Sequence, residues 1–128
     1  MSLNEYVFPE DARTIARDIA KEFRACPSHW TQGVAARSRC GYAAEASSPR
    51  AVCWCLKGAI DLRLHDGIPD QFRRQLAVYR AFDLVLGYPL PPAHMKDYAA
   101  LHFTTWNDQR GRTVEEVIAL CDKVASFP

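Results

Sequence analysis

The chain has 128 residues, of which 48% are hydrophobic and 24% charged, and its formal net charge is +1. This composition is typical of a folded globular protein and excludes a disordered one, and the length fits a single domain over residues 1–128. The near balance of 16 basic and 15 acidic residues excludes a bulk electrostatic attraction to nucleic acid or anionic lipid.

The pattern of apolar residues and of cysteines indicates the cellular location of the protein. The longest unbroken apolar run, Ala51 to Leu56, is too short to cross a bilayer. The first residues contain no basic segment followed by an apolar stretch, so we expect no signal peptide and no membrane partner. The five cysteines, an odd number, exclude a complete disulfide framework and favour a reducing, cytoplasmic location.

The first predicted element is an amphipathic helix over residues 10–25. Its apolar residues recur at the spacing of one helix face and are Ala12, Ile15, Ala16, Ile19, Ala20 and Phe23. The helix ends at Cys26 because a residue that precedes a proline avoids the helical region. We interpret residues 27–47 as an ordered loop with strand character, and a short hairpin near 30–42 is an open alternative.

The next element is predicted to be a central helix over about residues 49–65. Ser48 is a suitable N-cap, Pro49 suits the first helical position, and Gly67 is placed to end the helix. Because the segment is apolar on nearly every side, we expect the rest of the chain to surround it. Gly58 in mid-helix costs about 1 kcal/mol relative to alanine, which a closely packed neighbouring backbone would offset.

Three further helices follow in the second half of the chain. The third is predicted from Pro69 or Asp70 to Leu86, and a shorter fourth helix near residues 92–104. Trp106, Asn107 and Asp108 are expected to lead from it into a polar turn. The fold class is therefore mainly α, a compact domain of four to five helices around the buried central helix.

The last helix has the clearest start signal. Thr113 and Glu116 have the spacing of a capping box, in which each side chain bonds the backbone N–H of the other. The residues that follow supply the apolar stripe of an amphipathic helix, namely Val114, Val117, Ile118, Cys121, Val124 and Ala125. We therefore expect this helix to pack against the body of the domain.

Cysteines and histidines are the first candidate reactive groups in the chain. Cys26 and His29 have a plausible ligand spacing, and Cys40, Cys53 and Cys55 are candidates to complete a metal site. However, two cysteines separated by one residue on a helix point their sulfurs apart, and no histidine lies in a recognised catalytic neighbourhood. We therefore predict no catalytic residue, no metal and no cofactor, and we favour a protein that is not an enzyme.

The three tryptophans have two readings. Each indole buries a large apolar area and its N–H then needs an acceptor, and polar residues stand near two of them in the sequence. In the first reading they clamp loops onto the central helix as part of the core. In the second they line a small cleft for a ligand or partner. The residues of this candidate cleft are Trp30, Gln32, Trp54, Trp106, Asn107 and Asp108.

A basic row on the first predicted helix is a further candidate surface. It is formed at i+4 spacing by Arg13, Arg17 and Lys21. Such a row can contact phosphate, but acidic residues are interleaved with it. We favour a solvated helix face over a nucleic-acid footprint, because the net charge of the chain is close to zero.

Four ordered pieces of the chain carry a family resemblance. They are Trp30–Ala35, Ala51–Ile60, Thr105–Asp108 and Arg112–Val117. With them the chain resembles a set of small bacterial and phage-encoded proteins classified as domain of unknown function 6197. The resemblance implies a helical domain with tryptophans at fixed places, and it implies no activity. Between Gly33 and Ser48 the chain departs from the family pattern.

Three functions remain open from the sequence. The leading hypothesis is a small non-catalytic cytosolic interaction domain that binds a protein partner or forms a homodimer, with a contact surface near Tyr88 to Met95. The second is a small-ligand binder or enzyme that uses the cleft around Trp30, Trp54 and Trp106. The third is a weak nucleic-acid binder through the basic helix face.

Overall fold

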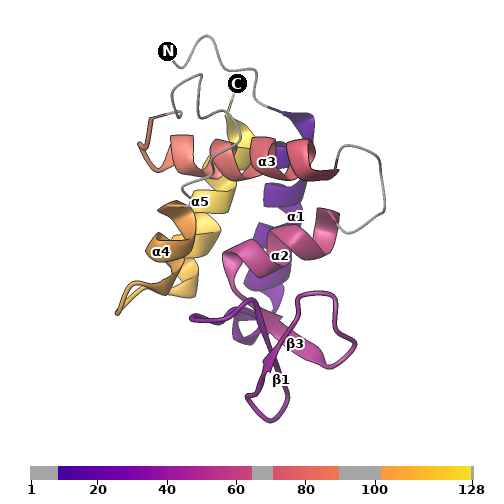
Figure 1. The fold of residues 1–128 in the computed structure, drawn as a ribbon. Helices are drawn as coiled ribbons and strands as arrows, with labels where there is room; N and C mark the ends of the chain where they lie inside the picture. The colour runs from indigo at the N-terminus through magenta and orange to yellow at the C-terminus, as the bar shows by residue number, and fades with distance from the viewer. Residues whose placement is uncertain (1–8, 65–70, 90–101, 128) are drawn as a thin grey trace.

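The computed structural model describes residues 9–64, 71–89 and 102–127 (Figure 1). Helices dominate these residues, so the predicted mainly α class is confirmed. The elements in chain order are α1 (Glu10–Ala25), η2 (Pro27–His29), β1 (Ala36–Ser38), β2 (Ala43–Ala44), β3 (Ala51–Trp54), α2 (Leu56–Leu64), α3 (Gln71–Val85), α4 (His102–Asp108) and α5 (Val114–Ser126). No described helix has both the length and the apolar character that a membrane span requires.

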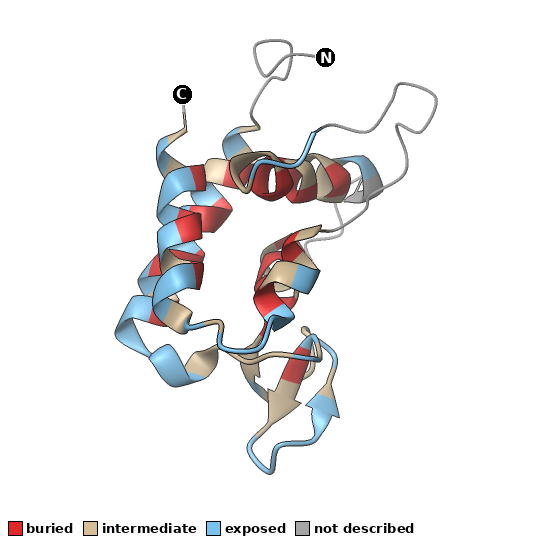
Figure 2. Cartoon of the chain, turned by 90° about the vertical axis from the view of Figure 1, so that its left-hand side faces the viewer, coloured by how far each residue is buried: buried red, intermediate tan, exposed pale blue. Residues whose placement is uncertain are grey.

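Helices α1 and α5 form the long side of the core. The six apolar residues predicted for the inner face of α1 are the six that are buried. They contact the buried face of α5, which consists of Val117, Leu120, Cys121 and Val124. Figure 2 shows the buried residues of both helices turned toward the interior. The predicted capping box at the start of α5 is present, with Thr113 Oγ1 accepting from the Glu116 N–H at 3.2 Å.

The predicted central helix over 49–65 is wrong in its first half. Residues Ala51–Trp54 form the strand β3, and the helix α2 begins only at Leu56. The hydroxyl of Ser48, expected to cap a helix, instead accepts the Arg50 N–H at 3.2 Å within a turn. Apolar residues such as Val52 and Trp54 suit a strand that has a partner to pair with, and β1 supplies that partner.

The three strands form an antiparallel sheet in the order β2-β1-β3. The hairpin expected near 30–42 exists as β1 and β2, displaced toward the C-terminus so that it ends at Ala44, and β3 joins it from farther along the chain. Residues 33–54, which carry the sheet, are called the sheet lobe below. The lobe projects from the lower end of the helical body in Figure 1, and the buried core cluster draws all its members from the helices.

Gly58 explains how closely the sheet lobe approaches α2. A Cβ atom at this position would lie 2.0 Å from the carbonyl oxygen of Ala35, a separation that no real side chain tolerates. The same carbonyl accepts the Cys55 N–H at 3.1 Å. The expected close packing of a neighbouring backbone against Gly58 is therefore confirmed, and that backbone belongs to the loop that leads into β1.

Helix α3 follows its prediction, whereas α4 does not. The aromatic rings of Tyr79 and Phe82 on α3 lie 5.4 and 5.8 Å from that of Phe103 on α4. Helix α4 extends to Asp108, so the tryptophan, asparagine and aspartate at 106–108 are helical and do not form the expected turn. Residues 92–101 of the predicted fourth helix lie outside the described residues.

The start of α4 is stabilised by a side chain from another helix. The buried carboxylate of Asp83 on α3 accepts the Phe103 N–H at 2.9 Å and the His102 N–H at 3.3 Å. These are two of the N-terminal amides that a helix cannot satisfy by itself. Because this cap comes from 19 and 20 residues away, the sequence around residue 102 gives no local sign of where α4 begins.

Candidate functional site

Asn107 is the centre of a hydrogen-bond network beneath the sheet lobe. Its side chain is 1% exposed, and its Oδ1 accepts the Trp30 indole N–H at 2.7 Å and the Leu56 backbone N–H at 3.2 Å. Its Nδ2 donates to the Thr31 carbonyl at 3.3 Å and to Asp108 Oδ1 at 2.9 Å. An asparagine side chain can make about four hydrogen bonds, so all of this capacity is used.

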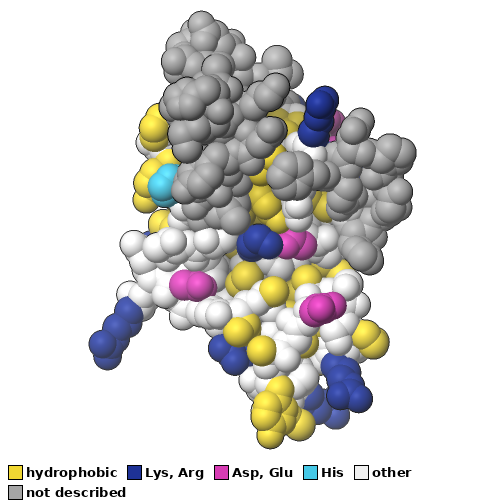
Figure 3. All heavy atoms as spheres, in the orientation of Figure 1, with side chains coloured by type: hydrophobic (Ala, Val, Ile, Leu, Met, Phe, Trp, Pro, Cys, Tyr) yellow, Lys and Arg dark blue, Asp and Glu magenta, His cyan; other side chains and the backbone are white. Residues whose placement is uncertain are grey.

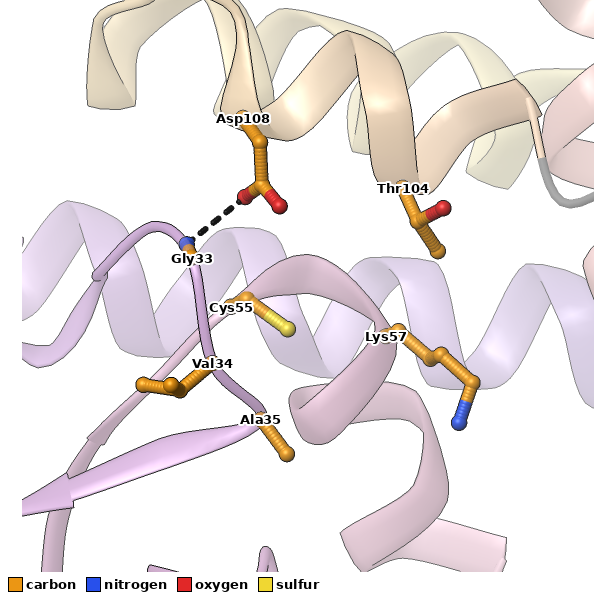
Figure 4. A pocket seen from close by; sticks show the side chains of 7 residues that line it. All are labelled: Gly33, Val34, Ala35, Cys55, Lys57, Thr104 and Asp108. Carbon is orange, nitrogen blue, oxygen red and sulfur yellow. Dashed lines mark hydrogen bonds between the residues drawn. The ribbon is translucent and has the colours of Figure 1, made fainter. Parts of the chain in front are cut away.

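Gln32 and Asp108 complete the same network. Gln32 Nε2 donates to the carbonyls of Asn107 and Gln109 at 2.8 and 2.9 Å. Asp108 Oδ1 also accepts the Gly33 N–H at 2.9 Å, the contact drawn as a dashed line in Figure 4. Gly33 has φ +85°, a conformation that favours glycine, so the loop can turn its amide toward α4.

The three tryptophans have different surroundings. The Trp30 indole N–H donates to Asn107, 77 residues away, and not to the neighbouring Gln32, whereas the Trp54 indole N–H donates to the Ala46 carbonyl at 2.9 Å. Trp30 and Trp54 are joined by a parallel β-bridge. The Trp106 ring instead lies under the Arg112 guanidinium, whose central carbon is 4.1 Å from the ring centroid. All three rings pack against the core cluster.

A pocket of about 190 Å³ opens beside this network. It lies between the loop before β1, the start of α2 and the helix α4 (Figure 4). Its lining residues are Gly33, Val34, Ala35, Cys55, Lys57, Thr104 and Asp108. Of the six residues predicted to form a cleft, Asp108 lines this pocket, so a ligand cleft around the tryptophans stays a prediction.

The thiol of Cys55 faces the pocket but is poorly suited to nucleophilic attack. Its Sγ accepts the Gly58 N–H at 3.3 Å at the N-terminus of α2, and the residue is only 9% exposed. Burial raises the pKa of this thiol, the hydrogen bond from Gly58 lowers it, and the charge of Asp108 raises it again. Because the thiolate is the nucleophile, a thiol that stays protonated near neutral pH is unreactive.

Lys57 connects the pocket to a second polar cluster. Its Nζ lies 2.7 Å from Asp61 Oδ2 and 5.5 Å from the centroid of the Tyr79 ring. Asp61 Oδ1 also accepts from Gln75 Nε2 at 3.0 Å and from the Tyr79 hydroxyl. Burial, together with the hydrogen bond to Asp61, raises the pKa of Tyr79, so its phenol remains a neutral donor. The charges of Lys57 and Asp61 thus face each other within the protein.

Local sequence could not have indicated most of the pocket. Nothing near Lys57 or Thr104 in the chain marks a site, and Cys55 is in the sequence only one of several candidate metal ligands. The change from strand to helix after Trp54 is visible in the structure alone, since the sequence predicts one helix there.

The basic row and the cysteine–histidine set also have defined places. Arg13 Nε donates to the Phe127 carbonyl at 2.8 Å and so attaches α1 to the end of α5, while Arg17 and Lys21 are exposed. His29 lies 3.2 Å from Glu22 and edge-on to Trp54. Within the described residues, no group of three or more His, Cys, Asp or Glu side chains is placed to hold a metal ion.

Comparison with known proteins identifies the family. No curated protein and no solved structure matches the chain. The profile of one family matches residues 11–127, which is nearly the whole chain and reaches from the first turn of α1 to the end of α5. The chain therefore belongs to DUF6197, a family of unknown function.

Proposed function

We propose that the protein is a single-domain, non-catalytic interaction module that contacts a protein partner through the sheet lobe. One observation carries this proposal. The polar residues of the candidate site are used in internal hydrogen bonds, with Asn107 fully satisfied. The partners of Asn107 include Trp30, Thr31 and Leu56, which flank the sheet lobe on both sides, so these bonds fix the two ends of the lobe on α4. The lobe contributes no residue to the buried core cluster, yet it is firmly attached.

The exposed surface of the lobe supports an interaction role. Among the described residues, three large hydrophobic side chains are exposed, and two of them, Tyr42 and Val52, lie on the lobe. Tyr42 is 76% exposed, so most of its ring is available for contact with another molecule. Loops and small appendages held by a rigid scaffold are where proteins commonly place binding residues.

The contact surface expected from the sequence, near Tyr88 to Met95, is described only at its start. Tyr88 is 38% exposed and its ring stacks on that of His102 at a centroid distance of 4.0 Å. Residues 90–95 lie outside the described residues. We therefore base the proposal on the lobe.

Five free cysteines support a reducing, cytoplasmic location, because exposed thiols such as Cys26 and Cys40 would oxidise outside the cell.

Photo-cross-linking tests the proposed function. A photoreactive phenylalanine replaces Tyr42 in the full chain, and the same group replaces Lys123 on the exposed face of α5 as a matched control. Irradiation in cells should give a discrete adduct from position 42 and not from position 123, and its mass distinguishes a second copy from a different protein. Equal adducts from both positions, or none from position 42, would contradict the proposal.

Small-ligand binding is the second candidate function, favoured by the pocket beside Asp108. Its volume of about 190 Å³ is below the range of about 300–1,000 Å³ that most ligand pockets occupy. A ligand screen read by tryptophan fluorescence tests this candidate, since Trp30 and Trp106 lie on the segments that border the pocket. A hit should be lost in Asp108→Ala and retained in the exposed control Thr105→Ala.

A further inference from the structure

The sheet lobe has more positively than negatively charged residues. Residues 33–54 contain three arginines and one glutamate, whereas the whole chain is nearly neutral. Figure 3 shows Lys, Arg and hydrophobic side chains gathered over the lower end of the molecule, where Figure 1 places β1 and β3. The lobe therefore combines apolar surface with a local excess of positive charge.

The three arginines of the lobe have different roles. Arg37 is half-buried and holds the lobe together by donating to the Gln32 and Gly41 carbonyls at 3.0 and 3.1 Å and to Thr31 Oγ1 at 3.1 Å. Arg39 and Arg50 are exposed, and neither guanidinium has a carboxylate at ion-pair distance among the described residues. Two cations of the lobe are thus available to a partner.

Each available cation lies close in sequence to an exposed hydrophobic side chain. Arg39 and Tyr42 share the turn between β1 and β2, and Arg50 precedes β3, in which Val52 is 43% exposed. Val52 has no partner residue in β1, because the pairing passes from Cys53 to Ala51. Arginine and tyrosine are, with tryptophan, the side chains enriched in the energetic centres of protein interfaces.

From this combination we infer that the sheet lobe docks an acidic polypeptide segment of a different protein. Carboxylates of the partner pair with Arg39 and Arg50, and its apolar side chains cover Tyr42 and Val52. The inference rests on the proposed interaction function and specifies the chemistry of the partner. Charge complementarity of this kind sets specificity and the rate of association more than the affinity.

A second copy of the chain fits this surface less well. A symmetric contact between two lobes would place the same patch against itself, so Arg39 and Arg50 would face the arginines of the other copy. Nucleic acid also fits less well, because binding through phosphates draws on several cations at once. The lobe offers two free arginines, and the chain as a whole has a net charge of only +1.

An NMR titration of the full chain tests the inference with defined probes. The probes are a peptide of alternating Glu and Leu residues, the matched Lys–Leu peptide and an oligothymidylate. The Glu–Leu peptide should shift the backbone amides of Arg39, Tyr42, Arg50 and Val52, and the other two probes should not. Shifts confined to other elements, or none at millimolar peptide, would overturn the inference.

Charge reversal provides the quantitative test. The double variant Arg39→Glu/Arg50→Glu should bind the Glu–Leu peptide about tenfold more weakly, as expected for two exposed ion pairs turned into repulsions, and should gain binding of the Lys–Leu peptide. The matched control is Arg110→Glu/Lys123→Glu, which reverses two exposed cations outside the lobe and should leave the affinity unchanged. Equal losses in both double variants would overturn the inference.

The remaining outcomes separate this inference from the proposed function. If oligothymidylate alone shifts the lobe amides, the lobe binds nucleic acid and the inference is wrong. If light scattering shows a dimer that Tyr42→Ser abolishes, the occupant is a second copy and the inference is again wrong. In the dimer case a cross-link from position 42 still supports an interaction module, so the proposed function survives without its acidic partner.

Discussion

Replacing Asn107 by alanine should destabilise the protein far more than its small volume suggests. The substitution leaves the Trp30 indole N–H and the Leu56 N–H without their acceptor, and the Thr31 carbonyl without a donor. A buried donor without a partner costs about 1–3 kcal/mol, so two donors give a loss of about 2–6 kcal/mol. That is a large fraction of the stability of about 5–15 kcal/mol typical of a domain.

The assay is urea denaturation followed by circular dichroism and by tryptophan fluorescence. The matched control is Thr105→Ala, an exposed position on the same helix, which should change the free energy of unfolding by less than about 0.5 kcal/mol. If Asn107→Ala also remains within about 0.5 kcal/mol of the wild type, then the network does not hold the lobe to the helices and the reasoning fails.

Asn107→Asp tests the same site through pH. The aspartate retains the oxygen that accepts from Trp30 and Leu56. Its second carboxylate oxygen takes the place of Asn107 Nδ2, which lies 2.9 Å from Asp108 Oδ1 in the wild type. Two carboxylates this close raise the pKa of one of them, so the folded state binds a proton more tightly than the unfolded state. The variant should therefore approach wild-type stability as the pH falls and lose stability as it rises. A stability deficit that is independent of pH would refute this.

Three further predictions concern other positions. Gly58→Ala should lower the urea midpoint, because its Cβ would meet the Ala35 carbonyl at 2.0 Å, and an unchanged midpoint would contradict the close approach. Burial raises the pKa of Asp83 above its ordinary 3.8, so the folded state binds the proton of this carboxyl more tightly than the unfolded state. Relative to Asp83→Asn, the wild-type free energy of unfolding measured in urea should therefore fall as the pH rises from about 3.8. A difference between the two proteins that stays constant with pH would count against this. The hydrogen bond from the Thr113 N–H lowers the pKa of Glu116, so the capping box should stabilise α5 above about pH 4.5 and lose this effect in acid. Glu116→Gln should remove that part of the pH dependence of unfolding. A pH profile of unfolding that the substitution leaves unaltered would refute this prediction.

The elements that the sequence predicted well are those with local signals. The apolar face of residues 10–25 and the Thr113–Glu116 capping box need no information from the rest of the chain, and both are found as predicted. The run from Ala51 to Leu56 is different, because a short apolar run suits a buried strand as well as a helix. Pairing with β1 stabilises the strand over the helix for Ala51–Trp54. The helix that follows is capped at Leu56 by Asn107, which lies 51 residues farther along the chain.

The sequence indicated some residues of the candidate site but not how they pair. Asn107 was expected to be able to accept an indole hydrogen bond because it stands beside Trp106, and the bond that it accepts comes from Trp30, 77 residues away. It could not indicate that Lys57 and Thr104 line one pocket, because these residues belong to separate helices that only the fold brings together. Nor could it show that Trp106 faces Arg112 and not the other tryptophans.

Three of the four pieces of sequence that carry the family resemblance meet where the lobe is attached. Trp30–Ala35, Ala51–Ile60 and Thr105–Asp108 supply the Asn107 network, the Gly58 contact and the bond from Gly33 to Asp108. The tip of the lobe, with its exposed arginine and tyrosine, lies between these pieces. The resemblance thus accounts for how the lobe is held. What the lobe binds must follow from the charge and exposure of its own surface, which is why Arg39, Tyr42 and Arg50 are the residues to change first.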